Sequence, residues 1–227
     1  MKDKRLKARL IKVADRLGSI PESPINQACN GWGEIKAAYR FFKNESVDAK
    51  DILATHSSRT ATRASEFQTI LAIQDTCYFS YTKHKKTTGL GVISKSPGKH
   101  IKMMTAVGVI MHTSFAVSTD GLPLGILDQK IFPRQVISEE LAERRDRTHN
   151  TDVAIEDKES FRWLESLDNT TQNMIGTTTK VVTVCDRECD FYEFFEKAKQ
   201  LETSVLVRAK SNRTINKDDR WANGEKL

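Results

Sequence analysis

The chain has 227 residues, 38% hydrophobic and 29% charged, which is the composition of a globular protein rather than a disordered one. No apolar run reaches the roughly 18 residues that a membrane span needs, and the N-terminus lacks the apolar core of a secretion signal, so a cytoplasmic protein is expected. Residues 1–102 carry 19 basic and 9 acidic side chains (+10) and residues 103–227 carry 17 and 21 (−4), which indicates a polyanionic partner for the first part unless surface charge fluctuates this much by chance.

The first fifty residues predict a group of short helices. Apolar residues recur at steps of four and three along residues 3–17, which predicts an amphipathic helix that ends at Gly18. Further helices are predicted over 24–29, over 34–43 after a tight turn at Gly31 and Gly33, and from Asp48 toward Glu66. The buried side of the 34–43 helix is expected to hold Ile35, Ala38, Tyr39 and Phe42. The charge of +5 over residues 1–50 (11 basic, 6 acidic) suits a small DNA-binding module, and the alternative is a helical subdomain that only packs.

The apolar pattern changes after residue 68, where three runs predict β-strands. They span residues 69–75, 103–112 and 122–132, and the last follows a turn at Asp120-Gly121. A polar loop is predicted over residues 82–89. The highly charged stretch 134–155 lacks periodicity, which predicts a loop or mobile segment.

The remaining residues predict two helices and two strands. The helices span 156–167 and 191–201, and the strands span 180–186 and 203–209. The order of three strands, helix, strand, helix, strand indicates a mixed α/β fold. The expected buried residues of the two helices are Phe161, Leu164 and Leu167 in the first, and Phe191, Phe194, Phe195 and Ala198 in the second.

Two of the predicted strands end in an aspartate, Asp75 and Asp186. If these strands lie side by side, both carboxylates emerge at one edge of the sheet, where they repel each other unless a cation lies between them. Mg²⁺ and Mn²⁺ prefer such oxygen ligands. Two ions about 4 Å apart can activate a water and stabilise the leaving oxygen of a phosphodiester. The alternative is that each aspartate only forms a turn or caps a helix.

The segments LAIQDTCYFSY and VCDRECDFYEFF around these aspartates resemble the catalytic motifs of bacterial cut-and-paste DDE transposases, in the group of insertion sequence four and transposon five. The segment with AYRFF is similar to that family's DNA-binding domain, and DKESFRWLESL resembles a helix of its core. The resemblance runs from Asp3 to about Arg213. It implies an α/β fold with a ribonuclease-H-like mixed sheet over residues 67–210, preceded by a small all-helical DNA-binding domain over 1–66, with 211–227 as the start of a further region.

The resemblance also implies a site. Asp75 and Asp186 match the first two of three metal-binding acids, with Mg²⁺ or Mn²⁺ as the cofactor. The implied partner is double-stranded DNA at transposon ends, at the bacterial nucleoid, with no membrane partner and with a homodimer only in the full-length form. Arg208 and Lys210 match a basic pair near the DNA, and a solvated strand end is the alternative for them. The residues expected to bind DNA are Lys4, Arg5, Arg9, Arg40, Lys83, Lys85, Lys86, Arg208 and Lys210.

One part of the family pattern is missing. The third acid is a glutamate in a Y-x₂-R-x₃-E-x₆-K signature, and no glutamate after Asp186 has these surroundings. The sequence therefore predicts the first part of a transposase, truncated or split by a frameshift, that is inactive alone. Glu188 and Asp190 are the first candidates to replace the third acid, although such carboxylates more often cap the following helix. The alternative function is a DNA-binding protein without catalysis that competes with a full-length transposase. The pair Cys185 and Cys189 is too small a motif to predict a metal site.

Overall fold

The computed structural model describes residues 3–97, 103–134 and 154–211. The chain divides into two compact units, Met1–His56 and Ser57–Leu227, and helix α4 (Ala49–Ala64) belongs in part to each. Within the described ranges, no helix is both long and apolar enough to cross a membrane. The stretches predicted as a loop over 134–155 and as a further region over 211–227 lie almost entirely outside these ranges.

The first unit consists of α1 (Lys4–Ser19), α2 (Ile25–Ala28), α3 (Gly31–Phe42) and the first half of α4. Asp3 caps α1 by accepting a hydrogen bond from the Arg5 N–H at 2.7 Å. The predicted C-cap at Gly18 is wrong by two residues, since α1 runs to Ser19 and Ile20 is its C-cap; the Ser19 hydroxyl donates to the Asp15 carbonyl in the last turn. The predicted start of α4 at Asp48 is confirmed, because Asp48 caps the helix: its Oδ1 accepts from the Lys50 N–H at 2.8 Å.

Helix α3 begins earlier than its sequence suggests. The predicted turn around Gly31 and Gly33 is instead the first turn of the helix, and the Asn30 N–H that precedes it donates to the carboxylate of Glu34 at 2.9 Å. The buried face is also rotated from the prediction. Ala38 and Phe41 are buried, whereas Tyr39 and Phe42 are 51% and 54% exposed.

The core of the first unit is small and is reinforced by charge. Val13, Cys29 and Ala38 form it, with partly buried Leu17, Ile25 and Ile35 packed around them. Glu34 of α3 pairs with two residues of α1, Lys12 at 2.8 Å and Arg16 at 3.0 Å. These hydrogen bonds lower the pKa of Glu34 to about 2.

The second unit is built on a six-stranded mixed sheet with the order β2-β3-β1-β5-β6, in which β4 also pairs with β3. Strand β3 runs antiparallel to β1, β2 and β4, while β5 and β6 run parallel to β1. This is the ribonuclease-H-like arrangement expected from the resemblance. The strands are β1 (Thr69–Ser80), β2 (Gly91–Pro97), β3 (Met103–Ser118), β4 (Pro123–Phe132), β5 (Lys180–Cys185) and β6 (Ser204–Val207).

The predictions for β1, β2 and β3 need correction. The strand β2 was not predicted, because its sequence GVISKSP is short and polar and contains a proline. Strand β1 does not end at Asp75 but continues to Ser80, since it pairs with β3 from Ile70 to Ser80. The same pairing extends β3 to Ser118, beyond the predicted end at His112. Asp75 therefore lies in the middle of a long strand, at the point where its other neighbour, β5, stops.

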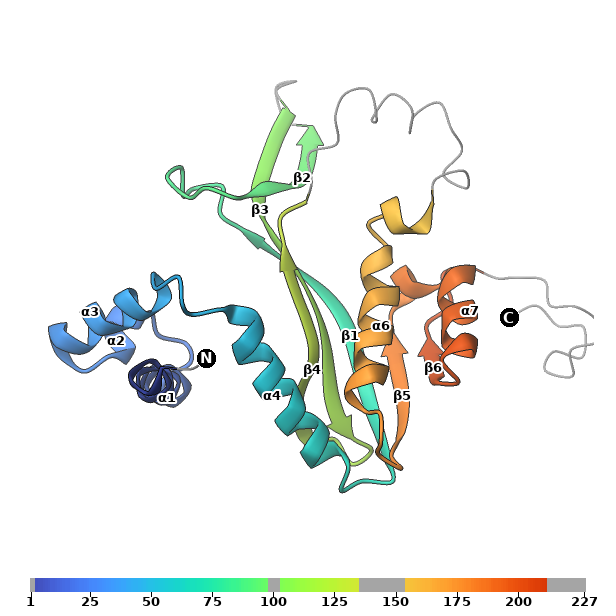
Figure 1. The fold of residues 1–227 in the computed structure, drawn as a ribbon. Helices are drawn as coiled ribbons and strands as arrows, with labels where there is room; N and C mark the ends of the chain where they lie inside the picture. The colour runs from blue at the N-terminus through green and yellow to red at the C-terminus, as the bar shows by residue number, and fades with distance from the viewer. Residues whose placement is uncertain (1–2, 98–102, 135–153, 212–227) are drawn as a thin grey trace, which may run out of the picture. The chain divides into compact units, whose positions relative to one another are not determined.

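Two helices cover one face of this sheet, α6 (Phe161–Asn173) and α7 (Tyr192–Gln200) (Figure 1). The prediction of a helix over 156–167 is wrong at both ends, because Ile155–Asp157 forms a separate 3-10 turn and α6 continues past Leu167. A second 3-10 turn, Arg187–Cys189, leads from β5 to α7. Phe195, expected to be buried, is 37% exposed. The core under the helices contains Trp163, Leu167, Cys185, Cys189, Phe194 and Ala198.

Candidate metal and nucleic-acid site

Asp75 and Asp186 occupy equivalent positions on neighbouring parallel strands. The last residues of the β1–β5 register are Ile73 and Val184, and each aspartate lies two residues further along its strand. Asp186 keeps an extended backbone, with φ −78° and ψ −173°. Since side chains alternate along a strand and neighbouring strands lie about 4.8 Å apart, both carboxylates belong to one face at one level. That they bind a metal stays a prediction.

Each carboxylate is held by one backbone N–H group and is otherwise open to solvent. Asp75 Oδ1 accepts from the Thr76 N–H at 2.7 Å, and Asp186 Oδ1 accepts from the Glu188 N–H at 2.8 Å. Both residues are exposed, and no protein group among the described residues donates to Oδ2 of either one. Exposed carboxylate oxygens are the donor type that Mg²⁺ and Mn²⁺ prefer.

The neighbouring acids are engaged elsewhere. Glu188 accepts a hydrogen bond from Arg162 at 2.9 Å, and buried Asp190 accepts one from the Lys210 N–H at 2.6 Å. In the part of the chain that the structure describes, no three His, Cys, Asp or Glu side chains gather closely enough to hold a metal ion. Within that part, Asp75 and Asp186 are a pair of candidate ligands rather than a complete set.

Arg208 lies at the same level on the third strand of this edge. Cys185 pairs with Val207, so the next residues along β5 and β6 are Asp186 and Arg208. The Arg208 N–H donates to the Cys185 carbonyl at 3.1 Å, which extends the pairing by one residue. The Arg208 side chain is exposed, as is that of Lys210. An exposed guanidinium at this edge of the sheet can bind a phosphate.

A polar network lies beneath the two aspartates, on the covered face of the sheet. Thr76 of β1 hydrogen-bonds His112 of β3 at 2.9 Å, and His112 also bonds Gln74 at 3.3 Å. The Arg162 Nε–H of α6 donates to the Thr76 hydroxyl at 3.1 Å. Burial, and secondarily the charge of Arg162, lowers the pKa of His112 to about 3. These residues were not predicted from the sequence, although Arg162 next to Trp163 on an apolar helix face was a usable signal.

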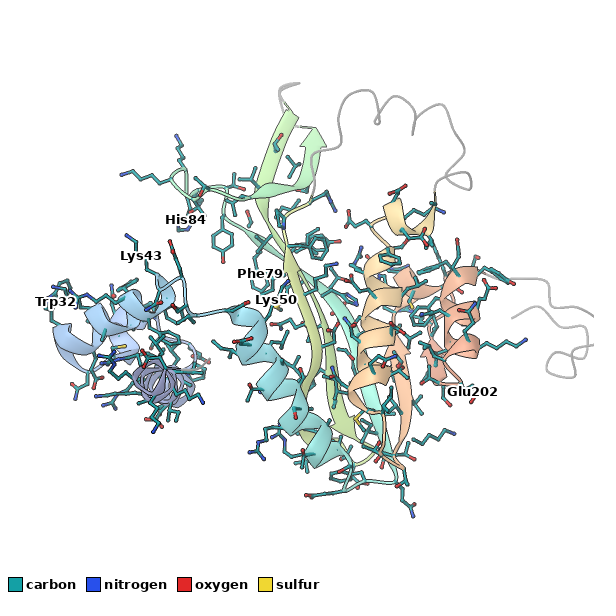
Figure 2. The ribbon with its side chains drawn as sticks, viewed as in Figure 1. Trp32, Lys43, Lys50, Phe79, His84 and Glu202 are labelled. Carbon is teal, nitrogen blue, oxygen red and sulfur yellow. The ribbon has the colours of Figure 1, made fainter. Side chains whose placement is uncertain are left out.

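In the first unit, α3 carries a row of exposed aromatic and basic side chains. We call this row the α3 stripe, and Figure 2 labels its two ends, Trp32 and Lys43. The spacing of four, three and four residues keeps the row on one helix face, opposite buried Ala38 and Phe41. Planar rings among cations suit a sugar-phosphate backbone. The stripe consists of Trp32, Lys36, Tyr39, Arg40 and Lys43.

The other predicted DNA-binding residues lie on both units. Lys4 and Arg5 are exposed at the start of α1, whereas Arg9 is half-buried. In the second unit, the loop between β1 and β2 exposes three lysines around His84, and Figure 2 labels His84. The rings of His84 and Tyr81 form a T-shaped pair, with 5.8 Å between their centroids. The loop was predicted correctly as polar. Its lysines are Lys83, Lys85 and Lys86.

Comparison with known proteins gives two findings. Residues 1–47 match the family described as transposase DNA-binding. A crystal structure of the Mos1 strand transfer complex is similar at a TM-score of 0.30 and 9% identity, over 88% of this chain and 57% of that one. A pre-cleavage Mos1 transpososome is similar at a TM-score of 0.30 and 9% identity, over 87% and 58%. This chain thus spans less than two thirds of the Mos1 chains.

Proposed function

We propose that this chain binds DNA and carries two metal-binding acids of a cut-and-paste DNA transposase, of the bacterial type that its motifs resemble. The observation that carries the proposal is the parallel register of β1 and β5, which ends two residues before both Asp75 and Asp186, in a chain whose first 47 residues match a transposase DNA-binding family. The proposed partner is double-stranded DNA at the ends of a transposable element. The proposed place of action is the nucleoid.

The two carboxylates of the site are ligands of the type that a divalent cation such as Mg²⁺ binds. Asp75 and Asp186 would hold Mg²⁺ or Mn²⁺ through their solvent-facing oxygens, and phosphate or water would complete the coordination. Such an ion, when bound, polarises a phosphodiester and makes water a better nucleophile. Arg208, at the same level as Asp186, would bind a phosphate of the DNA and orient the strand at the carboxylates.

Two measurements on the purified chain test this function. The first is an electrophoretic shift with a duplex that carries the DNA end flanking the gene, set against a scrambled duplex. We expect tighter binding to the element end and a steep loss of affinity with salt. The second is Mn²⁺ binding, followed by the decrease of the free-ion electron paramagnetic resonance signal. An Asp75→Asn/Asp186→Asn variant should lose this binding and keep DNA binding.

A second candidate function is DNA binding without catalysis, as a competitor of a complete transposase. The match to the DNA-binding family lies within the first compact unit, which carries the α3 stripe and does not include the two aspartates. End-specific DNA binding together with Mn²⁺ binding that is unchanged in the double aspartate variant would favour this function. Equal affinity for element-end and scrambled duplexes would contradict both candidates.

A further inference from the structure

Arg162 lies buried at the start of α6, with 7% of its side chain exposed. A buried guanidinium is costly unless its N–H groups find acceptors. Its acceptors come from three segments of the chain. Nε–H donates to the Thr76 hydroxyl of β1 at 3.1 Å, Nη1–H to the Glu159 carbonyl before α6 at 2.7 Å, and Nη2–H to the Glu188 carboxylate after β5 at 2.9 Å.

Two of these partners are the residues that hold the candidate metal ligands. The Thr76 N–H donates to the Asp75 carboxylate, and the Glu188 N–H donates to the Asp186 carboxylate. Arg162 therefore reaches each carboxylate through one intervening residue. Because the guanidinium is a planar, rigid fork, it fixes how far apart Thr76 and Glu188 lie.

The rest of the network fixes the orientation of the Thr76 side chain. Its hydroxyl accepts from Arg162, so its single proton is directed to Nδ1 of His112. The Nε2–H of the neutral ring then donates to the side-chain amide oxygen Oε1 of Gln74. With both roles of the hydroxyl assigned, rotation of Thr76 breaks one hydrogen bond whichever way it turns.

We propose that Arg162 is a positioning residue that sets the separation of Asp75 and Asp186 for a divalent cation, an inference that rests on the proposed metal site. Groups that orient metal ligands change metal affinity roughly 10- to 100-fold when they are removed. Lysine does not substitute for Arg162, because one ammonium on a flexible chain cannot hold three acceptors from three segments in one plane.

The test uses Mn²⁺ as the probe and the full 227-residue chain. In Arg162→Ala, we expect the Mn²⁺ dissociation constant to rise at least about tenfold while DNA affinity is unchanged. Guanidinium ion, at millimolar concentrations far below denaturing ones, should restore part of the Mn²⁺ affinity by occupying the vacated position. If Arg162→Ala does not fold, Arg162→Lys and Thr76→Val, which each remove part of the same network, should show the same loss in smaller degree.

Arg63→Ala is the matched control. Arg63 is also a helical arginine that donates to a strand carbonyl and to a threonine hydroxyl, those of Leu124 and Thr60, but it does not contact the residues around the two aspartates. Mn²⁺ binding equal to the wild type in Arg162→Ala would overturn the positioning role and leave the metal site standing. An equal loss of Mn²⁺ affinity in Arg63→Ala would also overturn the positioning role, because the loss would then be a general effect of destabilisation. Wild-type Mn²⁺ binding that persists in Asp75→Asn/Asp186→Asn would overturn the metal site, and this inference with it.

Discussion

His112 is 1% exposed and lies between Thr76, Gln74 and the Trp163 ring, with which it forms a T-shaped pair. Its pKa of about 3 means that the folded state holds it neutral far below the pH at which a free histidine takes up a proton. A neutral ring is also what the network requires, because a protonated Nδ1 could not accept from Thr76. The hydrogen bond between His112 and Thr76, the residue after Asp75 on β1, therefore depends on the histidine staying neutral.

The first prediction concerns acid stability. Below pH 6.5 the unfolded chain protonates His112 and the folded chain does not, so the free energy of unfolding should fall by at most about 1.4 kcal/mol per pH unit from pH 6.5 toward pH 3 through this group. In His112→Gln, this part of the slope should disappear. Urea unfolding at several pH values, followed by Trp163 fluorescence in a background with Trp32→Phe and Trp221→Phe, measures it. His84→Gln, at an exposed position, should keep the wild-type slope, and an unchanged slope in His112→Gln would contradict the prediction.

Element boundaries depend on contacts between segments that are far apart in the sequence. The apolar run before Asp75 is visible in the sequence, and so is the one before Asp186. Thr76, Tyr78 and Phe79 favour a strand locally, but where β1 ends is decided by how far β3 accompanies it. The parallel register of β1 and β5 likewise depends on contacts between distant segments. The prediction that both aspartates follow apolar strands needed only the local pattern.

The face of a helix is equally hard to assign when its start is misplaced. Glycines at 31 and 33 indicate a turn by propensity, but the bond from the Asn30 N–H to Glu34 starts α3 there. Tyr39 and Phe42 were therefore assigned to the core on hydrophobicity alone. A one-sided distribution of Lys36, Arg40 and Lys43 was the available signal that this face is exposed.

The second prediction is for the α3 stripe. If Lys36 and Lys43 each neutralise a phosphate, Lys36→Gln/Lys43→Gln should reduce the slope of log K against log salt by about 2 and weaken binding similarly for all duplex sequences. A salt titration of fluorescence anisotropy with an element-end duplex measures the slope. Lys180→Gln/Lys199→Gln removes the same charge from exposed positions of the second unit and should leave the slope unchanged. A reduced slope in this control variant would contradict the role of the α3 stripe. An unchanged slope in Lys36→Gln/Lys43→Gln would contradict it as well.

The third prediction concerns the connection between α1 and α3. Glu34 accepts from Lys12 and Arg16, and its pKa is lowered to about 2. A lowered carboxyl pKa stabilises the fold above the unfolded value near 4.5, and this contribution is lost as the pH falls toward 2. Glu34→Gln should therefore lower the Tm of the helical unit at pH 7, and the difference from wild type should shrink below pH 4.5. Circular dichroism melts at each pH measure it, and exposed Glu45→Gln should match the wild type throughout.

At the scale of the whole molecule, charge and chemistry are divided along the chain. The basic excess of the first 102 residues includes the α3 stripe and the lysines at the tip of the β1–β2 loop. The aspartate pair, Arg208 and the Arg162 network belong to the second unit. The proposed DNA binding by the first unit and the proposed metal binding at the sheet edge can therefore be lost separately, and the fourth prediction depends on that separation.

The fourth prediction is that this chain by itself binds element-end DNA but does not cleave it. Mg²⁺ held by only two carboxylates keeps several waters and is bound loosely, and a second ion at the leaving oxygen lacks a protein anchor among the described residues. Since positioning and charge stabilisation supply most of the rate, a poorly placed ion loses most of it. Incubation with Mg²⁺ or Mn²⁺ and a labelled element-end duplex, resolved on a denaturing gel, should show intact strands. Cleavage at the end that disappears in Asp186→Ala would contradict this and would make Glu188 or Asp190 the first residue to test as a third ligand, because a third oxygen donor close to Asp186 would then have to be present.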